Sequence, residues 1–173
     1  LMRGQHRWDE AEQSLAAARL ILAPQDTFSG LPETELEAYL PLLIEEASLM
    51  HATGHEEEAI RILEQAVSLF MVAYSEGDPG DYAAMQFARA RFERWRIDGH
   101  DLAREAPLLA KGLPAKPKGL SSCELEDLSM RLDLMADDLE AAAVHAAYLS
   151  DKQYRDPEYL DICLRAGLCD DGA

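Results

Sequence analysis

GHEEEAIRILEQA, residues 54–66, carries the pattern that decides the fold of this chain. Gly54 permits a tight turn between antiparallel helices, and the run of glutamates that follows suits a first helical turn, where the helix dipole favours acids. Ala59 is small enough to let the two helices of a hairpin approach closely, and Leu63 fills the core four residues later. Ala66, three residues further, lets a next hairpin stack on this one. The spacing predicts an amphipathic helix packed closely on two sides.

The rest of the chain also has helical character. Alanine, leucine and glutamate dominate, and the alternation of β-branched and aromatic residues that marks strands is missing. Proline and glycine divide the apolar patterns into separate segments. The fold class is therefore predicted to be all-α. The predicted helices span about residues 8–22, 33–51, 56–74, 81–97, 101–111, 123–149 and 157–165.

Residues 54–66, with Leu43, Ala47 and Met50 on the helix before them, resemble the tetratricopeptide repeat. The helix at 8–22 repeats the theme, and residues 81–111 carry a weaker third copy. Counted from Ala11 to Ala59 to Ala103, the copies are 48 and 44 residues apart, against about 34 in the family. The helices are therefore longer or the loops carry insertions. The alternative is a generic helical bundle with coincidental alanine spacing.

The resemblance implies stacked antiparallel helical hairpins in a right-handed superhelix over residues 1–111. Residues 112–120 contain two prolines and are expected to form a linker. Residues 121–173 are expected to add a long helix and a short C-terminal helix that pack on the repeats and cap them, within one continuous domain. Ser121 has capping-box spacing to Glu124 at the start of the long helix.

The predicted long helix carries a heptad seam of apolar residues. A coiled coil that makes a homodimer is one interpretation of this seam. Packing within the chain's own domain is the other, and a second apolar row on the same helix favours it. The seam consists of Leu125, Leu128, Leu132, Met135, Leu139, Ala142, Ala146 and Leu149.

Charge is unevenly distributed along a chain whose net charge is −17. Residues 1–80 hold 15 acids and 4 bases, residues 81–119 hold 5 and 8, and residues 120–173 hold 13 and 4. So acidic a chain repels the phosphate backbone, which argues against nucleic-acid binding. No apolar run reaches the roughly 18 residues of a membrane-spanning helix, so no membrane partner is expected. No signal peptide is visible, and the opening residues read as part of a helix, which suggests a piece of something longer.

Three cysteines without a Cys-x-x-Cys pair suit a reducing compartment better than a disulfide framework. We therefore predict a cytoplasmic location and structural thiols. His51 and His55 are four residues apart, but Gly54 breaks the helix between them and weakens them as a metal pair. No metal site and no cofactor are predicted.

The resemblance also implies a binding groove, because the first helix of each tetratricopeptide hairpin lines the concave face. In the second hairpin the corresponding residues are Ile44, Ser48 and His51. In the third they are Arg89, Glu93 and Arg96 if Gly99 marks the turn, or Ala88, Phe92 and Trp95 if Ala103 sets the register.

Arg89, Arg91, Arg94 and Arg96 lie on one predicted helix. Functionally, such arginines can hold an acidic peptide, a carboxylate or a phosphate through bidentate contacts. The alternative is that they neutralise the acidic helices on either side.

No catalytic motif was found: there is no phosphate-cradling glycine loop, no Gly-x-Ser-x-Gly elbow and no His-Glu-x-x-His. We expect a protein-interaction module or scaffold that binds a protein or peptide segment, not an enzyme. A regulatory or sensory domain of a larger signalling or transcription-regulator protein is the second hypothesis, and a helical enzyme is the third.

Overall fold

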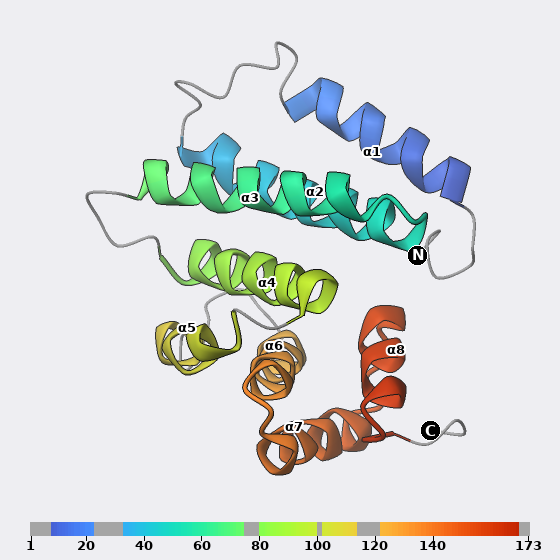
Figure 1. Ribbon diagram of the computed structural model, residues 1–173, viewed down its shortest axis with the longest axis vertical. Helices are drawn as coiled ribbons and strands as arrows, with labels where there is room; N and C mark the ends of the chain where they lie inside the picture. Colours follow the sequence, from blue (N-terminus) through green and yellow to red (C-terminus); the bar gives the residue numbers. More distant parts are fainter. Residues whose placement is uncertain (1–7, 23–32, 75–79, 100–101, 114–121, 170–173) are drawn as a thin grey trace. The chain divides into compact units, whose positions relative to one another are not determined.

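The computed structural model describes residues 8–22, 33–74, 80–99, 102–113 and 122–169 (Figure 1). Every regular element in these ranges is a helix, and no strand occurs among them, which confirms the all-α prediction. The chain forms two compact units, Leu1–Gly99 and His100–Ala173. The third predicted repeat, residues 81–111, is divided between these units at Gly99.

Four helices form the N-terminal unit: α1 (Trp8–Leu22), α2 (Glu33–Ala52), α3 (Glu56–Ala73) and α4 (Gly80–Asp98). These bounds agree with the predicted helices within a residue, because the glycines and prolines between them are local signals. α2 packs against α3, α4 packs against both, and α1 packs against α2 (Figure 1).

The core of this unit lies where α2, α3 and α4 meet. Ala59, Leu63 and Ala66 are fully buried there, as the spacing predicted, and Ala47 faces them from α2. Helices that meet at alanines approach closely, so the larger side chains around these positions fill the remaining space. α1 contributes only partly buried residues, Leu15 and Ala18, to this core.

Two features shape the ends and the middle of these helices. Gly54 has a φ of 81°, and the amide of His55 donates to the carbonyl of Met50, which ends α2 in a Schellman motif.

Pro41 was predicted to kink the second helix or delay its start. The helix begins at Glu33 and includes Pro41 without interruption.

The C-terminal unit contains the 3-10 turn η2 (Ala103–Glu105) and the helices α5 (Ala106–Gly112), α6 (Ser122–Met135), α7 (Leu139–Asp151) and α8 (Pro157–Arg165). α6 packs against α7, and α5 packs against α6. α5 covers the second half of the fifth predicted helix. The proposed cap residue Ser121 and most of the predicted linker lie outside the described residues.

The prediction of one long helix over residues 123–149 is wrong. Asp137 has a φ of 62°, and the amide of Asp138 donates to the carbonyl of Asp133 at 2.9 Å, so α6 ends in a Schellman motif. Asp138 then caps α7, since its carboxylate accepts from the amide of Ala141 at 3.0 Å.

The predicted heptad seam therefore runs over two packed helices. Its members Leu128, Leu132 and Met135 are buried on α6, and Ala142, Ala146 and Leu149 are buried on α7. The single helix through which a homodimer was considered does not exist, and these side chains supply the core of the α6–α7 hairpin.

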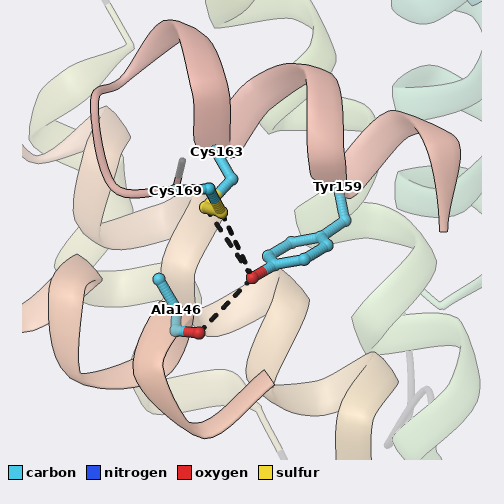
Figure 2. The surroundings of a disulfide bond; sticks show 4 residues. All are labelled: Ala146, Tyr159, Cys163 and Cys169. Atoms are coloured by element: carbon cyan, nitrogen blue, oxygen red, sulfur yellow. Dashed lines mark hydrogen bonds between the residues drawn. A yellow bond between two sulfur atoms is a disulfide. The ribbon is translucent and has the colours of Figure 1, made fainter. Parts of the chain in front are cut away.

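α8 has the predicted bounds and the predicted caps. The carboxylate of Asp156 accepts from the amides of Glu158 and Tyr159, Pro157 occupies the first position, and Gly167 ends the helix with a φ of 71°. The expectation of unpaired thiols is corrected here: Cys163 and Cys169 form a disulfide, with their Cα atoms 5.4 Å apart (Figure 2). Cys123 is free and half-buried.

Candidate functional site

The six residues predicted to line a groove lie on α2 and α4 of the N-terminal unit. Ile44 has no exposed surface and belongs to the core, and Ser48 is also buried. His51 is half-buried near the end of α2. Ile44 and Ser48 therefore offer no surface to a partner in this structure. The sequence could not show this, because the orientation of α2 depends on which helices surround it.

Two of the arginines of α4 contact acidic residues on neighbouring helices. Nη2 of Arg89 lies 2.6 Å from Oε1 of Glu45 on α2. Nη2 of Arg94 lies 3.5 Å from Oε1 of Glu64 on α3. Both partners belong to the acidic segment that precedes α4, so these two pairs fit the interpretation that the arginines neutralise acidic helices on that side of the chain. The carboxylate partners were not identified from the sequence, although residues 1–80 were recognised as acidic.

Glu93 is the most unusual member of the predicted set, because its side chain is fully buried. Its Oε2 accepts from Nε of Arg96 at 2.9 Å and from Nη2 of the same residue at 2.6 Å. A buried carboxylate without such a partner would be strongly unfavourable. The guanidinium of Arg96, which is partly exposed, thus compensates the buried carboxylate of Glu93.

The C-terminal unit contains a second buried charge cluster. Arg131 on α6 donates to both carboxylate oxygens of Asp127, at 3.0 and 2.8 Å, and its Nη1 lies 3.3 Å from Oε2 of Glu158 on α8. Burial raises the pKa of Asp127, and Arg131 opposes that shift. The cluster ties α8 to α6. The pKa of Tyr154 is also raised, chiefly by burial and then by the nearby Asp127.

His145 joins the two helices of the α6–α7 hairpin. Its Nδ1 lies 2.5 Å from Oε2 of Glu126, and its Nε2 lies 3.3 Å from Oδ2 of Asp133. Both carboxylates belong to α6. The pKa of Asp133 is raised by burial, and the nearby histidine opposes this shift. These contacts are within the hairpin and account for charged side chains that the sequence left unassigned.

Large apolar side chains are exposed in the last turns of two helices of the N-terminal unit. On α1, Leu20 and Ile21 are 71% and 79% exposed, and on α3, Met71 and Val72 are 58% and 74% exposed. These side chains are exposed to water and do not belong to the core of the unit. They are therefore candidates for contact with another molecule. These residues do not stand out in the sequence, because their exposure depends on how α1 and α3 pack.

Within the described ranges, no group of three or more histidine, cysteine or acidic residues is arranged to hold a metal ion. No described helix is long and apolar enough to cross a membrane.

Comparisons with known proteins add no relative. No protein-family profile, no curated protein and no solved structure matches this chain.

Proposed function

We propose that this chain is a protein-interaction module whose N-terminal helices present a surface to a segment of a partner protein. The observation that carries the proposal is the exposure of Leu20 and Ile21 on α1 and of Met71 and Val72 on α3. Contiguous exposed apolar patches mark protein contact surfaces, and each of these two helix ends exposes an adjacent pair of large apolar side chains. The packing of α4 on both α3 and α2 supports stacked tetratricopeptide-like hairpins as the scaffold for this surface.

The charge of the same helices limits the chemistry of the partner. α1 carries three acids and one arginine, and α3 carries four acids and one arginine. A partner segment that combines apolar side chains with lysine or arginine is therefore favoured, because opposite charge speeds encounter and apolar contact holds the complex. An acidic peptide bound by Arg89 and Arg96 is disfavoured, since it would compete with Glu45 and Glu93.

The test is affinity capture from native lysate with four versions of the chain. The first is wild type, the second combines Leu20→Ser with Ile21→Ser, and the third combines Met71→Ser with Val72→Ser. Leu108→Ser with Leu139→Ser is the matched control, since these residues are also exposed but lie in the C-terminal unit.

We expect a partner that wild type and the control retain, that both surface variants lose, and that moderate salt weakens. A partner retained by both surface variants would contradict the proposed surface. Capture of no partner by wild type would favour the second hypothesis, a regulatory or sensory domain of a larger protein.

A further inference from the structure

The Cys163–Cys169 disulfide connects the last turn of α8 to the residues that follow it (Figure 2). Gly167 reverses the chain between the two cysteines, and the amide of Leu168 donates to the carbonyl of Cys163 at 2.9 Å. The bond thus closes a short local loop and does not join distant elements. α8 has other anchors, namely its Asp156 cap and the Arg131–Glu158 contact. Its attachment to the unit therefore does not depend on the disulfide alone.

The two cysteines differ in exposure. Cys163 has no exposed surface, whereas Cys169 is only partly buried. Thiol–disulfide exchange begins when a thiolate attacks one sulfur along the axis of the bond, so the accessible sulfur is attacked and the other leaves. Access therefore selects Cys169 as the attacked residue and Cys163 as the leaving group.

The hydroxyl of Tyr159 lies beside both sulfurs. Its oxygen is 3.7 Å from Sγ of Cys163 and 3.6 Å from Sγ of Cys169, and the hydroxyl also donates to the carbonyl of Ala146 on α7 at 3.4 Å (Figure 2). A hydroxyl in this position can donate a hydrogen bond to a sulfur that gains negative charge. This hydrogen bond stabilises the leaving thiolate, and a more stable thiolate departs faster.

We propose that this end of α8 is a thiol–disulfide exchange site, at which a low-molecular-mass thiol attacks Cys169 while the Tyr159 hydroxyl stabilises the departing sulfur of Cys163. The incoming thiolate forms a bond to Sγ of Cys169. The bond between Cys169 and Cys163 breaks, and its electron pair remains on Sγ of Cys163, which then takes up a proton.

A second equivalent of the thiol completes the reaction. It attacks the sulfur of the bound small thiol, so a disulfide of the small thiol is released and Cys169 is left as a thiol. Two small thiols are oxidised and one protein disulfide is reduced. In the reduced state the Cys163 thiol can donate to the oxygen of Tyr159, whose own proton remains available to Ala146. The Tyr159 hydroxyl thus contacts the reacting sulfurs directly, as a donor while the bond breaks and as an acceptor once Cys163 is a thiol.

The experiment uses the full chain in a Cys123→Ser background, which removes the third thiol. The protein is exposed to reduced glutathione, quenched with an alkylating reagent at set times, and analysed by intact mass and peptide mapping. We expect the glutathione adduct on Cys169 and not on Cys163. An adduct on Cys163, or two free thiols in protein prepared without reductant, would overturn the proposal.

A second measurement tests the role of the hydroxyl. Tyr159→Phe should slow the first exchange step about three- to tenfold, as expected for one lost hydrogen bond. Tyr154→Phe is the matched control, because the ring centroid of Tyr154 lies 5.4 Å from that of Tyr159. This variant should react at the rate of wild type. Equal rates for Tyr159→Phe and wild type would remove the tyrosine from the mechanism. The adduct position in wild type tests the site even if Tyr159→Phe fails to fold.

Discussion

Ala59 shows how much a single side chain decides at the residue scale. It has no exposed surface and lies in the core shared by α2, α3 and α4. We expect Ala59→Leu to cost about 1–3 kcal/mol of unfolding free energy, because the added atoms have no space at a close helix contact. Trp8 and Trp95, the two tryptophans of the chain, lie in this unit, so urea denaturation followed by tryptophan fluorescence measures the change.

The control for this variant is Ala73→Leu, on the exposed end of the same helix. Its unfolding free energy should stay within about 0.5 kcal/mol of wild type. An Ala59→Leu protein as stable as the control would show that the helices do not meet closely at this position.

Asp127 predicts a pH dependence for the C-terminal unit. Its folded-state pKa lies above the ordinary value of 3.8, since burial outweighs the effect of Arg131. The folded chain therefore holds this proton more tightly than the unfolded chain. The resulting stabilisation is complete below about pH 3.8 and is lost as the pH rises through the folded-state pKa.

The test compares wild type with Asp127→Asn by denaturant unfolding across this pH range. The stability of wild type relative to the variant should fall as the pH rises. A relative stability that increases with pH would show that Arg131 outweighs burial. Arg131→Met should cost about 3–5 kcal/mol at neutral pH, because it leaves the buried carboxylate of Asp127 and the partly buried one of Glu158 without their cation.

At the scale of elements, the ends of the helices separate what could be predicted from what could not. α2 and α8 end in Schellman motifs with Gly54 and Gly167 at the left-handed position. α6 and α7 end in the same motif, but Asp137 and Gln153 occupy that position, with φ values of 62° and 54°. Glycine marks such an end in the sequence, whereas aspartate and glutamine do not. The end of α6 was therefore missed.

The apolar pattern contributed to the same error. Met135 and Leu139 are four residues apart, so the helical spacing continues across the break between α6 and α7. Both helices of a hairpin need a buried face, and a seam cannot distinguish one long helix from two that pack together. The prediction of the candidate site was limited in a similar way. The arginines of α4 could be identified from the sequence, but their partners Glu45 and Glu64 follow only from the packing of the helices.

Two substitutions test these helix ends. Asp137→Gly and Gln153→Gly should each raise the unfolding free energy by up to about 1 kcal/mol, since glycine removes the cost of the left-handed conformation. Gly54→Ala should lower it by about 1 kcal/mol for the converse reason. Thermal unfolding followed by circular dichroism gives all three values. Destabilisation by both glycine variants would mean that the side chains at these ends contribute more than their backbone conformation costs.

At the scale of the whole molecule, charge repulsion is the dominant long-range interaction. The chain has 33 acids and 16 bases, and many of the described bases already pair with acids nearby. Salt screens repulsion between distant acids more than it weakens partly buried pairs. We expect the melting temperature to rise when sodium chloride is increased from about 10 to about 150 mM. A decrease would show that the exposed ion pairs contribute more than the repulsion costs; sorbitol of equal osmolality is the control.

Pro41 has a consequence for how α2 opens. It has no backbone N–H, so the carbonyl of Glu37 lacks its usual partner and the helix has one missing hydrogen bond near its middle. Separating the turns before Pro41 from the turns after it therefore breaks one hydrogen bond fewer than elsewhere in the helix, but it also exposes the buried Tyr39 and Leu40. In deuterated solvent, the amide protons of residues 37–40 would exchange through this small opening. The amide protons of residues 42–52 would exchange only when the α2–α3 hairpin itself opens.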